Sequence, residues 1–218
     1  GTDVIKIRGV KELHGCNYSI IPDQIEAGSY MVAAAITKGD VLLHNVIPKH
    51  MEPITAKLRA AGCQIEEYDD SMRITRTGAL KPLKIKTMPH PGFPTDMQPL
   101  MTVLLCLAEG TSIVTEGIWE NRFRYVDELI RMGANIQVDG QVAVIEGVKQ
   151  LMPAPLRALD LRAGAAMVMA ALAADGVSEV DETIHIERGY ENIVEKLQAL
   201  GADIRRVETP VNAVTRAM

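Results

Sequence analysis

Aromatic residues are scarce in this chain of 218 residues, which holds two Phe, five Tyr and one Trp. A block of basic residues is also missing, and the formal net charge is −5 at pH 7. Surfaces that bind nucleic acid usually combine clustered Lys and Arg with aromatic side chains that stack on bases. The composition therefore argues against a nucleic-acid partner, although it leaves room for a local anion-binding site.

Long hydrophobic runs and paired cysteines are lacking too. The longest apolar run, Ala165–Ala174, has ten residues, whereas a membrane-spanning helix needs ~20. The chain does not open with the charged and apolar segments of a secretory signal. Its cysteines, Cys16, Cys63 and Cys106, are odd in number and have no metal-ligand spacing, which favours free thiols in a reducing cytoplasm. We expect a cytoplasmic protein with no membrane partner and no metal site.

The chain does contain a repeat, and it occurs three times. Each copy runs from an Asp through an apolar helical pattern to a Gly, then through an amphipathic helical pattern to a second Gly. The Asp-to-Gly separations are 16, 14 and 16 residues, and the Gly-to-Gly separations are 23, 23 and 25. The residues are Asp23, Gly39 and Gly62, then Asp96, Gly110 and Gly133, then Asp160, Gly176 and Gly201.

Each repeat reads as a β-α-β-α-β-β unit. Its first helix is apolar on all sides, its second has one apolar face, and short alternating strands follow, as around the Asp139-Gly140 turn. Three such units bury their first helices best against one another. We therefore predict an α/β (α+β) domain that is an inside-out barrel, with helices inside and sheets outside. An N-cap role accounts for the Asp that opens each first helix.

The opening residues match a later part of the chain. Ile5–Leu13 resembles Val142–Leu151, which closes the second unit. We therefore predict that residues 1–20 are the tail of a preceding repeat, β-structured over residues 4–13 and paired beside a strand near Ile204. Residues 21–218 are predicted to form the three-repeat domain.

Four strings in the three units give the chain a family resemblance. It resembles the C-terminal half of the UDP-N-acetylglucosamine 1-carboxyvinyltransferases, a branch of the enolpyruvyl transferases, from Ile21 to about Val207. The strings are FPTDMQ (Phe93–Gln98), ENRF (Glu120–Phe123), ALDLRAGAA (Ala158–Ala166) and IERGYENI (Ile186–Ile193).

The resemblance implies a two-domain enzyme whose active site lies in the cleft between the domains. It implies transfer of enolpyruvyl from phosphoenolpyruvate to the 3-hydroxyl of UDP-N-acetylglucosamine, with phosphate release, at the first committed step of peptidoglycan synthesis. No metal or organic cofactor is implied. The N-terminal half, with its catalytic cysteine loop and phosphoenolpyruvate-binding Lys-Asn pair, has no match here, so we expect a fragment that is inactive alone.

The resemblance also assigns site residues. It makes Asp96 the base for the sugar hydroxyl, Arg188 a phosphoenolpyruvate contact, and Asp160 and Arg162 a pair at the cleft. Arg122 belongs to the same group, and the backbone of Ile118 touches the nucleotide. The residues alone also allow a purely structural account, in which the aspartates cap helices and the arginines pair with neighbours such as Glu187 or Glu191 for Arg188.

Two departures and two other functions complete the expectations. Gly92 and Gly117 replace the Ala and Thr common in the family, which we expect to loosen the site. The alternatives are an enolpyruvyl transferase acting on shikimate 3-phosphate, and a non-catalytic repeat module that binds a partner.

Overall fold

A computed structural model describes residues 4–207 of the chain. The helices are α1 (Gln24–Ile36), α2 (Pro48–Ala60), α3 (Gln98–Cys106), α4 (Val126–Arg131), α5 (Leu161–Ala173), α6 (Ile184–Glu187) and α7 (Ile193–Ala199), with 3₁₀ turns η1 (Thr95–Met97) and η2 (Arg122–Tyr125). The strands are β1 (Asp40–His44), β2 (Gln64–Glu67), β3 (Ser71–Thr75), β4 (Lys84–Lys86), β5 (Thr111–Thr115), β6 (Asn135–Asp139), β7 (Val142–Glu146), β8 (Pro155–Arg157) and β9 (Glu179–Asp181). Between residues 4 and 207, no helix has the length and apolar character to cross a membrane.

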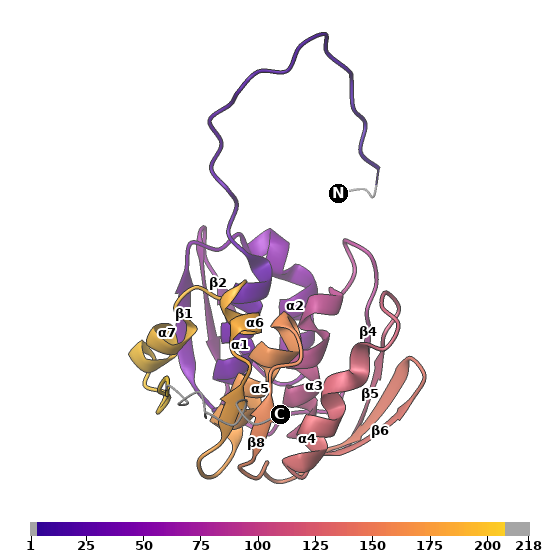
Figure 1. Cartoon of the computed structure of the whole chain (residues 1–218), viewed down its shortest axis with the longest axis vertical. Coiled ribbons are helices and arrows are strands. Elements are labelled where there is room, and N and C mark those ends of the chain that lie inside the picture. Colours follow the sequence, from indigo (N-terminus) through magenta and orange to yellow (C-terminus); the bar gives the residue numbers. More distant parts are fainter. Residues whose placement is uncertain (1–3, 208–218) are drawn as a thin grey trace, which may run out of the picture.

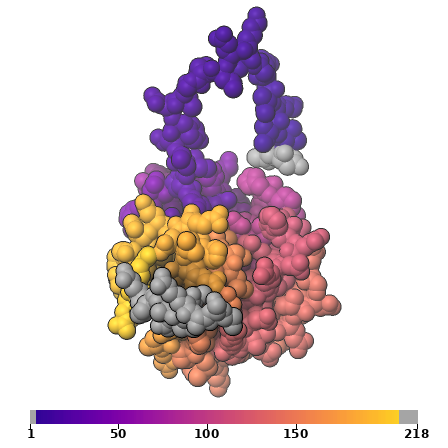
Figure 2. All heavy atoms as spheres, viewed as in Figure 1, coloured from indigo at the N-terminus to yellow at the C-terminus, as the bar shows by residue number. Residues whose placement is uncertain are grey.

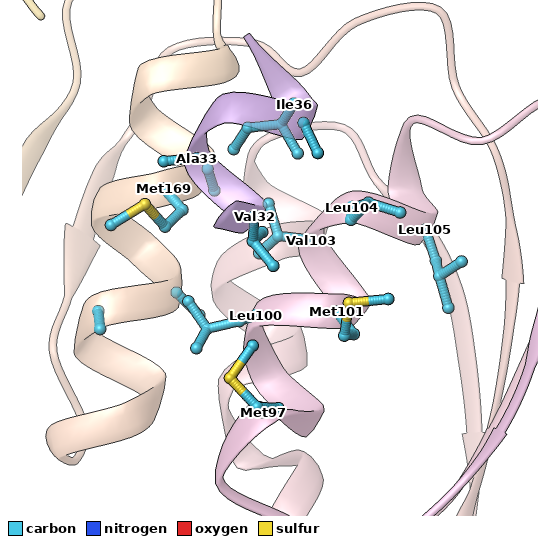
Figure 3. Close-up of a cluster of buried hydrophobic side chains, with 14 of the residues drawn as sticks. Val32, Ala33, Ile36, Met97, Leu100, Met101, Val103, Leu104, Leu105 and Met169 are labelled. Atoms are coloured by element: carbon cyan, nitrogen blue, oxygen red, sulfur yellow. The ribbon is translucent and has the colours of Figure 1, made fainter. Parts of the chain in front are cut away.

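The apolar first helices α1, α3 and α5 form the centre of the molecule. They pack on one another, and Met167, Val168 and Met169 of α5 are buried as predicted. Figure 3 shows side chains of α1 and α3 meeting there, with Met169 of α5 beside them. A helix surrounded by other helices has no face left for water, and this explains the all-round apolar pattern of each copy.

Three sheets lie outside these helices. Their strand orders are β1-β3-β2, β4-β5-β7-β6 and β8-β9. Figure 1 shows the β1–β2 strands on one side of the helices and the β4–β6 strands on the other. Along β7 the side chains of Ala143 and Ile145 are buried while those of Val144 and Glu146 face outward, as expected for a sheet with one wet face. The prediction of helices inside and sheets outside is confirmed.

In the described part of the chain, the second copy of the repeat is the one that has all four strands and both helices. Among residues 4–207, the first copy lacks the strand before its first helix, and the third lacks the closing hairpin. The predicted helix ends are confirmed, since Gly62, Gly133 and Gly201 have φ values of 102°, 86° and 94°. These values lie in the left-handed region, where a Cβ would be strained.

The opening segment contradicts our prediction of a strand over residues 4–13. No residue from 4 to 20 is helical or in a strand, and most side chains there are exposed. Figure 2 shows this segment arching clear of the body. The region near Ile204 forms no strand either, and the Ile204 carbonyl accepts the Gln198 side-chain amide at 2.6 Å. A strand needs a neighbour that pairs its backbone groups, and the described part of the third copy offers none. The predicted ranges 1–20 and 21–218 also include residues 1–3 and 208–218, outside the described part.

Arg76, just after β3, joins the first sheet to the first central helix. Its buried guanidinium donates to the carbonyl oxygens of Ala35 and Ile36 at the end of α1, and to that of Gly78 at 2.6 Å. A cation is favourable at this end of a helix, where the last carbonyl oxygens lack partners within the helix. The amides of Thr37 and Gly39 already bond the carbonyls of Ala33 and Ala34, so Arg76 completes the C-terminal cap of α1 by satisfying the last two carbonyls.

Candidate active site

Asp96 lies between two arginines from different repeats. Its Oδ2 atom is 3.2 Å from Nε of Arg162 at the start of α5, and its Oδ1 atom is 3.5 Å from a terminal nitrogen of Arg122 in η2. The Asp96 side chain is 40% exposed, whereas each arginine side chain is only 15% exposed. The carboxylate therefore reaches solvent while the cations that hold it are largely covered.

The three aspartates of the repeat do not share one role. Asp23 caps α1 by accepting from the Ile25 amide at 2.7 Å, and Asp160 caps α5 by accepting from the amides of Arg162 and Ala163 at 2.9 and 2.7 Å. Asp96 caps nothing. It lies inside η1, and α3 begins at Gln98 with no side-chain cap. The capping account is thus right for Asp23 and Asp160 and wrong for Asp96.

Asp160 also changes what the start of α5 offers a ligand. Its carboxylate already accepts from two amides of the first turn, so an anion here would meet the Arg162 guanidinium more readily than the helix terminus. Among the described residues, Nη1 of Arg162 and Nε of Arg122 are buried without a hydrogen-bond partner. Unpaired guanidinium N–H groups are strong donors for carboxylate and phosphate oxygens.

The Arg162 guanidinium lies over the ring of Tyr190. The guanidinium carbon lies 5.7 Å from the centre of the Tyr190 ring, a favourable stacking arrangement. The Tyr190 hydroxyl and the Ser29 hydroxyl of α1 are 2.8 Å apart. Burial lowers the pKa of Arg162, but the influence of Tyr190 and Asp96 outweighs it and raises that pKa overall. Burial is also the largest influence on Tyr190 and raises its pKa.

Arg188 is exposed at the end of α6 and lines a surface hollow of about 510 Å³ with Tyr190 and Glu26. Neither predicted neighbour pairs with it, because Glu187 binds Arg206 and Glu191 has no ion pair among residues 4–207. The expected pairing of Arg188 with Glu187 or Glu191 is therefore wrong, although its surface position is as expected. No hydrogen bond or ion pair in the described part joins it to Asp96, Arg122 or Arg162 either.

Ile118 belongs to a loop organised by Glu116, a residue that our sequence reading did not single out. The Glu116 carboxylate accepts from the amides of Ile118 at 2.9 Å and Trp119 at 3.1 Å. It also accepts from the hydroxyls of Thr87 at 2.7 Å and Thr95 at 3.0 Å. A signal existed: Ser112, Val114 and Glu116 are every second residue along β5 and beyond, so Glu116 takes an inward position. All three are buried.

The two glycine departures do not loosen the site. A Cβ at Gly117 would lie 2.6 Å from the Thr87 carbonyl oxygen, and one at Gly92 would lie 2.5 Å from Met88 Cβ. The backbone has closed into the space that a side chain would need, so our expectation was wrong. Within residues 4–207, no three His, Cys, Asp or Glu side chains group so as to hold a metal ion.

Comparison with known proteins identifies the family of the chain. Residues 1–197 match the family model described as EPSP synthase (3-phosphoshikimate 1-carboxyvinyltransferase). UDP-N-acetylglucosamine 1-carboxyvinyltransferase 3 of Caldanaerobacter subterraneus is 60% identical over 95% of this chain and 50% of its own length. UDP-N-acetylglucosamine 1-carboxyvinyltransferase of Desulfofundulus thermocisternus is 55% identical over all of this chain and 92% of its own length. The chain thus spans half of the first relative and nearly all of the second.

Solved structures show the same fold. The enolpyruvyl transferase NikO from Streptomyces tendae superposes with a TM-score of 0.81 at 30% identity, over 88% of this chain and 45% of NikO. EPSP synthase from Acinetobacter baumannii gives a TM-score of 0.70 at 19% identity, over 87% of this chain and 48% of that one. The second likeness supports the fold alone.

Proposed function

The chain belongs to the EPSP synthase family of enolpyruvyl transferases, and from that premise we propose that it is one domain of a UDP-N-acetylglucosamine enolpyruvyl transferase. The reaction transfers the enolpyruvyl group of phosphoenolpyruvate to the sugar 3-hydroxyl and releases phosphate, which commits the sugar to peptidoglycan. Relatives named for this activity are 52–60% identical to the chain. The shikimate 3-phosphate alternative has support from the family description and from fold likenesses at 19 and 20% identity, which bear on the fold alone.

The observation that carries the proposal is the position of Asp96. A carboxylate at the start of a first helix is expected to cap it, yet Asp96 instead lies partly exposed between two covered guanidinium groups. A sugar hydroxyl is a weak nucleophile, so its attack on an enol ether carbon needs a base within hydrogen-bond reach. Asp96 is the group available for that proton. This arrangement also disfavours a non-catalytic module, because a structural role does not require a partly exposed carboxylate that caps no helix.

The arginines complement the charge of the other substrate. Phosphoenolpyruvate and the tetrahedral intermediate carry a carboxylate and a phosphate, which guanidinium groups bind in a bidentate manner. Arg162 and Arg122 have buried N–H groups to spare, and Arg188 faces the adjoining hollow. We assign phosphate and carboxylate binding to these three residues, and nucleotide contact to the backbone at Ile118.

The reaction also needs a proton donor for the methylene carbon of phosphoenolpyruvate. No described cysteine serves, since Cys63 and Cys106 are buried in the core and Cys16 lies in the opening segment. We propose that the acid and further cations come from an N-terminal half and that residues 1–20 connect to it. Residues 21–218 form the three-repeat enolpyruvyl transferase domain in this proposal. We propose a cytoplasmic location for the enzyme, which fits its charged substrates.

A phosphate-release assay tests this proposal. The purified chain, given phosphoenolpyruvate and UDP-N-acetylglucosamine, is expected to release no phosphate above background, because the acid is absent and no second domain closes over the site. Addition of the complementary half from a relative should restore release. Amide chemical shifts near Ile118 should respond to UDP-N-acetylglucosamine and not to shikimate 3-phosphate. Robust release by the chain alone, or the reverse ligand preference, contradicts the assignment.

A further inference from the structure

Glu116 is a buried carboxylate without a cationic partner. Its residue is 1% exposed, and no ion pair involves it among residues 4–207. The other buried glutamate, Glu128, pairs with Arg131 at 3.1 Å. An isolated buried charge is costly unless several donors compensate it. Glu116 meets this need with four neutral donors, two hydroxyls and two backbone amides.

Those donors come from three separate parts of the chain. Thr87 follows β4, Thr95 opens η1 directly before Asp96, and the two amides belong to the loop at residues 117–119. The Thr87 hydroxyl also accepts from the Gly117 amide at 2.7 Å, so it links Glu116 to the loop a second time. The close approach of Gly117 to the Thr87 carbonyl shows how tightly this loop is drawn in.

We infer that Glu116 is a positioning residue that holds the loop at residues 117–119 and the turn bearing Asp96 in one fixed arrangement. The inference rests on the proposed function for the identity of the ligand. The side chains of Ile118 and Trp119 remain exposed at the surface while their amides point inward to Glu116. A single carboxylate therefore sets the distance between the loop proposed to meet the nucleotide and the carboxylate proposed to meet the sugar hydroxyl.

The ionised form suits this task better than a neutral side chain. Hydrogen bonds to a charged acceptor are shorter and stronger than neutral ones, and one oxygen of Glu116 accepts three of the four donors. A glutamine keeps one acceptor oxygen in place, but its amide nitrogen meets the Thr95 hydroxyl and its oxygen carries less charge. A methionine fills a similar volume and accepts almost nothing.

The experiment compares Glu116→Gln, Glu116→Met and Thr87→Val with wild type, and with Glu128→Gln as the control for a buried carboxylate elsewhere. Trp119 is the sole tryptophan of the chain, so its fluorescence reports on the loop directly. Hydrogen exchange of the Ile118 and Trp119 amides reports on their bonds to Glu116. The dissociation constant for UDP-N-acetylglucosamine is measured on the same full chains, with thermal unfolding recorded for each.

We expect loop exchange to accelerate and binding to weaken roughly tenfold or more in Glu116→Met, as for loss of a hydrogen bond to a charged group. Glu116→Gln should recover part of both effects, and Glu128→Gln should change neither even where it lowers the unfolding temperature. If Glu116→Met does not fold, amide exchange and the dissociation constant of Thr87→Val and Glu116→Gln test the positioning role instead. Unchanged exchange and unchanged binding in folded variants would overturn the inference.

The two proposals fail differently. If the wild-type chain shows no response to UDP-N-acetylglucosamine, the proposed function is wrong for this chain, while the exchange of the Ile118 and Trp119 amides still decides whether Glu116 holds the loop. If wild type binds and the variants bind equally well, the function stands and the positioning role fails.

Discussion

Replacing Asp96 with asparagine separates the roles of the repeat aspartates. The change preserves shape and removes one negative charge that faces two guanidinium groups at 3.2 and 3.5 Å. With the dielectric constant of bulk water, these distances correspond to about 1.3 and about 1.2 kcal/mol of attraction. Water is the appropriate limit because the Asp96 side chain is 40% exposed, and the entropy of holding the pair reduces the sum. We expect a loss of about 1–2 kcal/mol, or about 2–8 °C in unfolding temperature.

Asp160→Asn is the matched control. Asparagine caps a helix nearly as well as aspartate, so we expect a change of about 0.5 kcal/mol or less. Urea unfolding of both variants at low salt and at about 0.5 M salt measures the difference. At the higher salt the Debye length is about half its value at 0.15 M, so exposed ion pairs are weaker. The Asp96→Asn loss should shrink at high salt. Two outcomes would refute the assignment of Asp96 as an ion-paired residue that caps no helix: equal effects of the two substitutions, or an Asp96→Asn effect that does not depend on salt. In the complete enzyme the same variant should lose ~10²-fold or more in turnover.

Two further outcomes follow from buried contacts. Gly117→Ala should destabilise the chain by about 1–3 kcal/mol in urea unfolding, because the new Cβ meets the Thr87 carbonyl oxygen; wild-type stability would show that the loop yields. Burial raises the pKa of Cys63 from 9.0 to about 11 and that of Cys106 to about 12. Stability should therefore be intact below pH 9 and fall as pH rises toward those values, by up to about 1.4 kcal/mol per pH unit for each thiol. At pH 8 iodoacetamide should label only the exposed Cys16 in the native chain, and equal labelling of all three would contradict the burial.

The repeat pattern predicted the architecture because the spacing of apolar residues along each helix and strand shows which of its faces must be buried. A helix without a polar face has to be central, and an alternating strand has to cover it, so the order of layers followed from α1, α3 and α5. Glu116 lay within reach of the same reasoning. It continues the inward alternation of β5 by one residue, and a carboxylate at an inward position signals a site where donors converge.

The role of Asp96 and the state of residues 4–20 lay beyond local pattern. Capping depends on the backbone angles of the residues around the aspartate: Asp96 lies inside a 3₁₀ turn, whereas Asp23 and Asp160 directly precede an α-helix. Only the fold shows the two arginines that replace the cap. Likewise, Ile5–Leu13 matches a strand, but similarity of sequence does not provide the adjoining strand that a ladder requires.

Arg76 has a consequence for how the molecule opens. Its guanidinium binds the last carbonyls of α1 from the end of β3, so the helix terminus cannot fray without also releasing the sheet. The amides at the end of α1 and those that pair β3 with β1 should then exchange with solvent together, as one cooperative unit. The substitution Arg76→Met would divide that unit, and the first repeat would begin to unfold from its helix end while the sheet stayed paired.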